Sequence, residues 1–229
     1  MEVEFPAAVS GNMTAILKLF DPRHPPTFPM GQRGLLRPHG PHDQLAWEDF
    51  VRKDKLRPFL DEITAVEKQG LWSAWYELGD EEPQSHEALG RYEAGLYRTT
   101  LEEFDSETRA YGRFRDLQGK CIPRLYAHVF IQAQTADPAL AGRPEFSIFG
   151  IFMESIRGFI LEKLPDLPAS DAPPKELWKT IVQDAVYAAN EINKRGVVML
   201  DCRAGNALVE HDTHRVVIHD LPSANSATR

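Results

Sequence analysis

Three oxygen-bearing side chains near the end of the sequence have the types and spacing to hold a cation and move a proton. Asp201 and Asn206 lie in the segment Leu-Asp-Cys-Arg-Ala-Gly-Asn, and Asp220 follows the apolar run Val-Val-Ile-His. Such a set can hold a magnesium ion beside a phosphate, because hard cations prefer oxygen ligands. It can also leave one carboxylate to accept or orient a hydroxyl proton. The competing interpretation is structural, because Asp, Gly and Asn are common turn residues and an acid after a strand often caps the next element.

The patterns on either side predict how these side chains are positioned. Apolar residues recur at three-to-four spacing over 174–195, which predicts a long helix that Gly196 ends. Two short apolar strands follow, at 207–209 and 216–219, joined by turn-like residues. The candidate side chains would therefore flank a hairpin that follows a helix.

Four more elements are predicted upstream. Residues 14–20 read as a strand with Lys18 in its middle. The spacing of apolar residues predicts an amphipathic helix over 101–117, with Glu107 on the flank of its buried stripe. Residues 124–132 and 146–154 are apolar runs of strand length with a polar loop between them, so we expect an antiparallel pair.

The segment between the first strand and the helix is irregular. Six prolines fall within 21–43, a density that excludes a helix or an inner strand. Residues 44–69 then show the spacing of one helix, or of two helices broken at Pro58. Residues 71–78 form a second apolar patch, followed by a loop over 79–85.

The spacing Asp201-x-x-x-x-Asn206 after a long helix is that of a protein-kinase catalytic loop, and with it the chain resembles the protein-kinase-like superfamily. More narrowly, it resembles the divergent kinase-like proteins of filamentous fungi, truncated at both ends. The resemblance implies an α+β, protein-kinase-like bilobal fold with a small antiparallel sheet lobe and an incomplete helical lobe. Residues 1–154 would form the N-terminal lobe, with a large insertion at about 21–100. Residues 155–229 would form the hinge and a truncated C-terminal lobe that holds the catalytic loop and the metal-binding segment.

The resemblance also implies a reaction, the transfer of the γ-phosphoryl group of ATP to a hydroxyl acceptor on a protein or a small molecule. Lys18 would contact the ATP phosphates and Glu107 would hold Lys18. Asp201 matches the catalytic aspartate, whereas Asn206 and Asp220 match the residues that hold Mg²⁺.

The adenine base would lie beside the strand that leads into the hinge. In the segment Gly-Ile-Phe-Met-Glu-Ser-Ile-Arg-Gly, Met153 matches the residue at the back of the adenine pocket. Glu154 to Ile156 would offer backbone groups to the base.

The chain departs from the family pattern in ways that keep other functions open. It has no G-x-G-x-x-G loop, Met199-Leu200 replaces His-Arg, and Leu221-Pro222 follows Asp220, with only nine residues after that aspartate. A catalytically inactive pseudokinase or gene fragment that binds nucleotide or a protein is one alternative. In that case the incomplete C-terminal lobe would leave part of the apolar face of the helix over 174–195 uncovered. A small-molecule kinase of the aminoglycoside or choline kinase type is another, because those relatives share the spacing. An unrelated α+β interaction domain is a third.

Composition narrows the class of protein. The 229 residues are 42% hydrophobic and 26% charged, as in an ordinary globular chain. The net charge of -8 and the dispersed basic residues argue against a nucleic-acid partner. No signal-peptide pattern or long apolar run is present, and the two cysteines have no metal-site spacing. We therefore expect an intracellular protein, cytoplasmic or nuclear, with no membrane partner.

Single residues also have simpler interpretations. Lys18 alone would be a solvated residue of an edge strand. Glu102 and Glu103 compete with Glu107 as the partner of that lysine. Cys202 has no activating neighbour in the sequence, so an inert thiol is expected. Five histidines in loop-like or strand-end sequence are expected at the surface rather than in a metal cluster. They are His39, His42, His211, His214 and His219.

Overall fold

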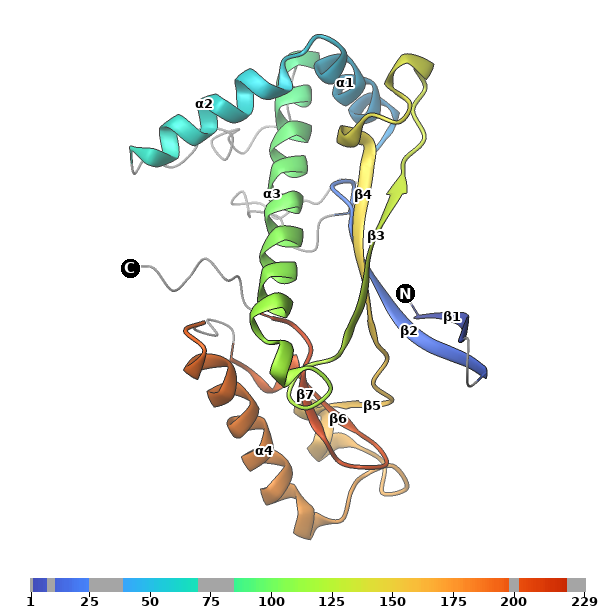
Figure 1. Cartoon of the computed structure of the whole chain (residues 1–229), viewed down its shortest axis with the longest axis vertical. Coiled ribbons are helices and arrows are strands. Elements are labelled where there is room, and N and C mark those ends of the chain that lie inside the picture. The colour runs from blue at the N-terminus through green and yellow to red at the C-terminus, as the bar shows by residue number, and fades with distance from the viewer. Residues whose placement is uncertain (1, 8–10, 25–38, 70–84, 198–201, 222–229) are drawn as a thin grey trace. The chain divides into compact units, whose positions relative to one another are not determined.

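The chain is a mixed α+β protein with two small sheets and several helices (Figure 1). This computed structural model describes residues 2–7, 11–24, 39–69, 85–197 and 202–221. The chain divides into two compact units. The first contains residues 1–18, 104–129 and 150–229, and the second contains residues 19–103 and 130–149. The boundary predicted at 154 falls inside the first unit, whereas the second unit contains the segment predicted as an insertion.

One sheet has four strands in the order β1-β2-β4-β3. Strand β1 (Glu2–Ala7) pairs antiparallel with β2 (Gly11–Phe20), with Glu2 opposite Ile16. Strands β3 (Leu125–Gln132) and β4 (Ser147–Glu154) lie side by side and run antiparallel, as predicted, with backbone hydrogen bonds from Glu154 to Arg124 and from Ala133 to Phe146. The predicted strand with Lys18 is confirmed as the second half of β2, and β1 was not predicted.

The first unit also holds a three-stranded antiparallel sheet in the order β5-β6-β7, formed by Gly158–Ile160, Ala207–Glu210 and Val216–Ile218. Helix α4 (Lys175–Lys194) packs against β7 (Figure 1). The helix ends where expected, with Gly196 at a φ of +75°. Ile181 and Ile192 are buried, but Val186 is 56% exposed, so only part of the apolar face is covered.

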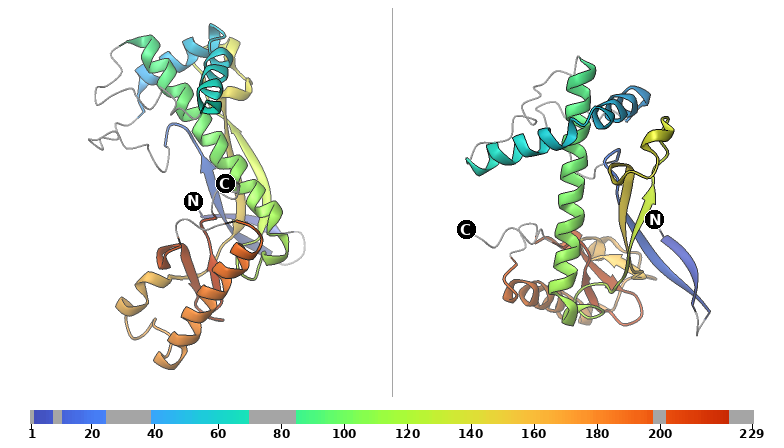
Figure 2. Two further views of the ribbon diagram at one scale, coloured as in Figure 1. Left: turned by 90° about the vertical axis from the view of Figure 1, so that its left-hand side faces the viewer. Right: turned by 45° about the horizontal axis from the view of Figure 1, so that its top comes forward.

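The second unit is built around helices α1 (Pro41–Arg52), α2 (Leu56–Lys68) and the first turns of α3 (His86–Arg113). Figure 2 shows α1 and α2 beside this end of α3. Their contact faces form one hydrophobic cluster in which Trp47 stacks tilted on Tyr97 and Phe146, with ring centroids 5.3 and 5.9 Å apart. Burial of these large rings fixes how the three helices pack.

Two helix predictions are wrong in detail. Residues 44–69 do form two helices, but the break lies at Lys53–Lys55 and not at Pro58. Pro58 occupies the first turn of α2, where its missing N–H has no intrahelical partner to lose. Helix α3 begins at His86, fifteen residues before the predicted start at 101. Residues 71–84, predicted as an apolar patch and a loop, lie outside the described residues.

The remaining regular structure consists of short 3₁₀ turns. They span Arg115–Leu117, Pro138–Leu140, Pro144–Phe146, Leu161–Asp166 and Ala204–Asn206. Among the residues that the structure describes, no helix is both long and apolar enough to cross a bilayer.

Candidate functional site

The centre of the candidate site is an ion pair between Lys18 on β2 and Glu107 on α3. The Nζ of Lys18 donates a hydrogen bond to Oε2 of Glu107 at 2.6 Å. Both residues belong to the first unit, although many residues separate them in the sequence. Glu107 is 6% exposed, while the lysine side chain is 35% exposed. The ammonium group is thus held by a buried carboxylate, and the lysine side chain as a whole is partly exposed.

The helix pattern explains why the carboxylate of Glu107 is buried. Glu107, Ala110, Tyr111 and Phe114 lie three or four residues apart, and each is buried. Glu107 therefore belongs to the buried stripe itself, whereas the sequence pattern predicted it on the flank of that stripe. Its Oε1 is buried without a hydrogen-bond partner in the described part of the chain.

Asp220 joins this pair from the C-terminal side of β7. Its Oδ1 lies 3.6 Å from Nζ of Lys18, and its side chain is 55% exposed. Burial lowers the pKa of Lys18, but Glu107 and Asp220 outweigh burial and leave that pKa above its usual value. Burial raises the pKa of Glu107 despite the neighbouring ammonium group. Lys18 therefore offsets part of the effect of burial on the pKa of Glu107.

Asn206 is brought to the same end of the hairpin as Asp220. The residue immediately after it, Ala207, pairs with Ile218 across β6 and β7, and the carbonyl of Asn206 accepts a hydrogen bond from the N–H of His219 at 3.1 Å. Asn206 is buried, so its amide is held in place rather than moving freely in solvent. Asp201, the predicted catalytic aspartate, lies outside the described residues.

The predicted adenine-contacting residues follow along the end of β4. Met153 is buried, and the hydroxyl of Tyr111 donates to its sulfur at 3.9 Å. The N–H of Glu154 donates to the carbonyl of Arg124 at 2.8 Å, and the Glu154 carboxylate accepts from Arg124 and Arg215. The N–H of Glu154 is therefore used within the fold. Ile156 is half-buried in the turn between β4 and β5.

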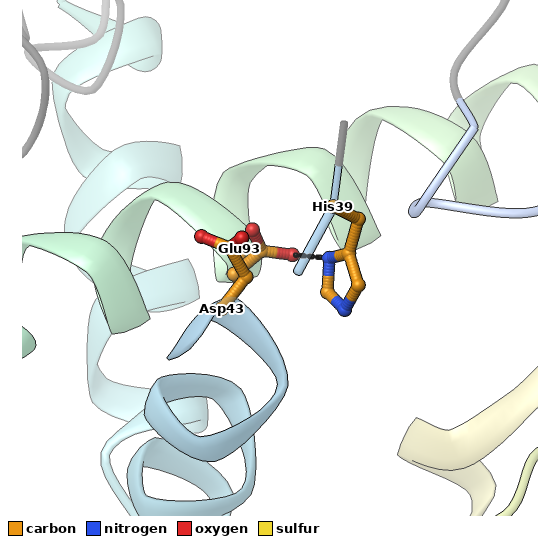
Figure 3. A group of neighbouring side chains, drawn as sticks. All are labelled: His39, Asp43 and Glu93. Carbon is orange, nitrogen blue, oxygen red and sulfur yellow. Dashed lines mark ion pairs between the residues drawn. The ribbon is translucent and has the colours of Figure 1, made fainter. Parts of the chain in front are cut away.

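The structure corrects the expectation that all five histidines are surface residues. His39 has a side chain only 13% exposed and lies beside Asp43 and Glu93 in the second unit, which are both buried. One ligand atom from each of the three residues lies within 4.8 Å of the others (Figure 3). Sequence reasoning missed this group because Glu93 is far from the other two along the chain. The local signal was the acid four residues after His39, at the start of α1.

The two cysteines are free, as the spacing predicted, with Cys121 buried and Cys202 exposed. Burial raises the pKa of the Cys121 thiol, so this thiol is held in its protonated form.

No protein-family model and no curated protein matches the chain.

Proposed function

We propose that the chain is an ATP-dependent phosphotransferase with a kinase-like bilobal fold, and that Lys18, Glu107, Asn206 and Asp220 bind the Mg²⁺–ATP phosphates. The observation that carries the proposal is the meeting of Lys18, Glu107 and Asp220, with Nζ 2.6 Å from one carboxylate and 3.6 Å from the other. The same three residues are those that the sequence resemblance selected for the lysine, its glutamate partner and the metal-binding aspartate.

The lysine environment suits phosphate binding. A buried carboxylate fixes the position of Nζ and the raised pKa keeps Lys18 charged. An ammonium group is a compact positive charge with several donors and is a common phosphate ligand. A surface lysine with no partner would give the same charge but no fixed position.

The metal requirement follows from the charges. Glu107 and Asp220 together outnumber the single positive charge of Lys18, so a phosphate chain would meet net negative charge without a further cation. Asn206 and Asp220 supply the hard oxygen ligands that Mg²⁺ prefers, and Mg²⁺ when bound would neutralise the phosphates. Asp220 is the more exposed of the two and could turn from Lys18 toward the ion.

The phosphoryl acceptor is a hydroxyl group, with Asp201 as the residue that accepts or orients its proton. Met153 and backbone groups of Glu154 to Ile156 would form the surface against the base. Most of the rate enhancement would come from positioning and charge neutralisation.

Nucleotide binding without transfer is the second candidate. It is favoured by Leu221, which is buried directly after Asp220, at the place where the family pattern has the aromatic residue of a mobile segment. A buried leucine followed by proline would restrict the backbone that must rearrange around the metal.

Thermal unfolding with ATP, with and without Mg²⁺, tests the proposal. ATP at 100 times its dissociation constant should stabilise the wild type by about 2.7 kcal/mol, and only when Mg²⁺ is present. Asp220→Asn should abolish the shift, whereas the matched control Asp212→Asn, an exposed aspartate in the β6–β7 turn, should retain it. No shift in a wild type that unfolds cooperatively would reject both candidates.

Transfer is tested separately from binding. Release of inorganic phosphate from ATP, or labelling of the chain by γ-labelled ATP, is expected from the wild type and not from Asp201→Asn. A shift in melting temperature without either signal would favour the binding-only candidate.

A further inference from the structure

We propose that His39, Asp43 and Glu93 form a site for one divalent transition-metal ion, with Zn²⁺ as its best-fitting occupant. The site lies in the second unit and does not depend on nucleotide binding. His39 lies two residues before α1, Asp43 lies in the first turn of α1, and Glu93 lies on α3. A bound ion would therefore tie the start of α1 to α3.

The first argument concerns the orientation of the imidazole. Nε2 of His39 lies 3.4 Å from Oε1 of Gln44, and Nε2 of Gln44 donates to Oε1 of Glu48 at 2.8 Å. Because the amide nitrogen must face the Glu48 carboxylate, the amide oxygen faces His39. The Nε2 of His39 is thus the ring nitrogen that carries the hydrogen. In the neutral ring, Nδ1 then bears a lone pair.

Glu48, which fixes the orientation of the Gln44 amide, is itself held in place. Glu48 is 1% exposed, and its Oε1 also accepts from the backbone N–H of Ala136 at 2.9 Å. Metal-bound histidines commonly donate their second N–H to a carboxylate or carbonyl oxygen, which fixes the ring and its tautomer. His39, Gln44 and Glu48 form an outer shell of this kind.

The second argument concerns the contact between His39 and Glu93. Nδ1 of His39 lies 3.3 Å from Oε2 of Glu93, an ion pair when the ring is protonated, but the two atoms do not meet hydrogen-bond geometry. In the neutral ring the lone pair of Nδ1 would face a carboxylate, so this position attracts either a proton or a metal ion between the two groups. Figure 3 shows the Glu93 carboxylate facing this nitrogen, with the Asp43 carboxylate next to it.

The distances suit an ion of the size of Zn²⁺. Two ligands about 2.1 Å from a tetrahedral zinc are roughly 3.4 Å apart. The pair formed by Nδ1 of His39 and Oε2 of Glu93 already has such a separation, at 3.3 Å. All three ligand atoms lie within 4.8 Å of one another. Oδ2 of Asp43 accepts from the N–H of Gly40 at 2.7 Å, which holds that side chain at the start of α1.

A fourth ligand position is available as water. His39 and Glu93 line a cavity of about 30 Å³ together with Arg23 and Gln44, whereas Asp43 does not line it. A water molecule needs roughly 10–15 Å³ of such volume, so the cavity has room for a water on the side of the site that His39 and Glu93 face. One imidazole with two carboxylates selects a borderline ion such as Zn²⁺ over Mg²⁺ or Ca²⁺, which prefer oxygen ligands alone.

Isothermal titration of the metal-free full chain with ZnCl₂ tests the site. One Zn²⁺ per chain is expected to bind, with MgCl₂ failing to compete. Outer-shell substitutions typically weaken binding 10–100-fold, so His39→Gln and Glu93→Gln should each weaken it by more than about 100-fold, and Gln44→Leu by about 10–100-fold. His42→Gln is the matched control, because His42 is exposed in the same turn of α1, and it should bind as the wild type does.

Two results would overturn the site. One is unchanged affinity in folded His39→Gln and Glu93→Gln, which would assign the zinc to other histidines. The other is the absence of one-to-one binding by the wild type at micromolar zinc. If neither variant folds, the visible spectrum of the wild type with CoCl₂ decides. A four-coordinate Co²⁺ site absorbs far more strongly than the hydrated ion, and a spectrum like that of the hydrated ion would reject the proposal.

Discussion

At the scale of single residues, the decisive feature is that Lys18 is the cation for a carboxylate buried on α3. Glu107 is 6% exposed and its Oε1 has no hydrogen-bond partner within the described ranges, so its charge depends on Nζ of Lys18. A buried charge that loses its partner costs more than a surface ion pair contributes. The stability of this region is therefore linked to the residue proposed to bind phosphate.

Replacing Lys18 with methionine should destabilise the chain by about 1–3 kcal/mol at pH 7, because Glu107 is left buried without a cation. Burial would then hold the pKa of Glu107 above its unfolded value of about 4.3. A raised folded-state pKa favours folding below the unfolded value and loses that effect as pH rises. The deficit should thus shrink as pH falls from 7 toward about 4.3 in urea unfolding.

The double variant Lys18→Met/Glu107→Gln is the control for this prediction, since it removes the buried charge together with its partner. It should recover most of the lost stability. A double variant as unstable as Lys18→Met would mean that the lysine acts through its packing and not through Glu107.

Asp21 contributes to stability with a pH dependence opposite to that of Glu107. Arg23 donates to its two carboxylate oxygens at 2.9 and 2.8 Å. Burial raises the pKa of Asp21, but these bonds outweigh it and leave the pKa lowered. A lowered folded-state pKa stabilises the fold above the unfolded value of about 3.9, and this contribution is lost as pH falls through the folded value.

We therefore expect Asp21→Asn to cost about 1 kcal/mol at pH 7 and less at pH 3. Urea unfolding of both proteins at the two pH values measures this difference. If the difference in free energy of unfolding between wild type and variant were the same at both pH values, the effect could not be assigned to the ionised carboxylate.

At the scale of elements, the end of α1 shows why sequence reasoning placed a helix break incorrectly. Asp54 has a φ of 51°, its N–H donates to the carbonyl of Val51, and the N–H of Lys55 donates to the carbonyl of Phe50. These two bonds form the Schellman motif, which satisfies the last carbonyls of a helix. The motif usually has glycine at the left-handed position, so aspartate there gave no stop signal and Pro58 drew the prediction instead.

Asp54→Gly should stabilise the chain by about 0.5–1 kcal/mol, because glycine adopts the left-handed conformation without steric cost. Asp54→Val should destabilise it for the opposite reason. The side chain of Asp54 is 87% exposed, so lost contacts contribute little to either change. Thermal unfolding of the two variants measures the effect, and the same sign for both would exclude backbone conformation as its cause.

Helix α3 contains two glycines whose surroundings predict opposite effects of substitution. A Cβ atom at Gly90 would lie 2.8 Å from Cδ2 of Phe50 and 3.1 Å from the carbonyl oxygen of Ala46. At Gly112 the same atom would meet nothing within 4 Å. Gly90 thus permits close packing of α3 on α1, which the sequence could not reveal.

Gly112→Ala should stabilise the chain by up to about 1 kcal/mol through helix propensity. Gly90→Ala gains the same propensity but forces Phe50 to move, so a net loss of about 1–3 kcal/mol is expected. Guanidinium unfolding of both variants compares them within one helix. A stabilising Gly90→Ala would show that Phe50 and α1 can shift without cost.

At the scale of the whole molecule, the predictions from the sequence agree best with the structure for regular strands and helices. The strand with Lys18, the strand pair β3–β4, helix α4 and the hairpin β6–β7 were predicted because apolar periodicity marks them. The contact among Lys18, Glu107 and Asp220 was predicted from a family resemblance and not from periodicity. The group His39, Asp43 and Glu93 depends on how α1 packs on α3, and no local pattern encodes that packing.

The two proposed sites lie in different units and share no residue, so their ligand responses should be separable. Asp220→Asn should abolish stabilisation by Mg²⁺–ATP and leave the Zn²⁺ affinity unchanged within about twofold, since effects of independent sites add. Glu93→Gln should do the reverse. Thermal shifts and zinc titrations on the same preparations measure both responses. If Glu93→Gln also removed the ATP response while the variant stayed folded, the zinc site would be coupled to the nucleotide site. The second unit would then act as a regulator of the first.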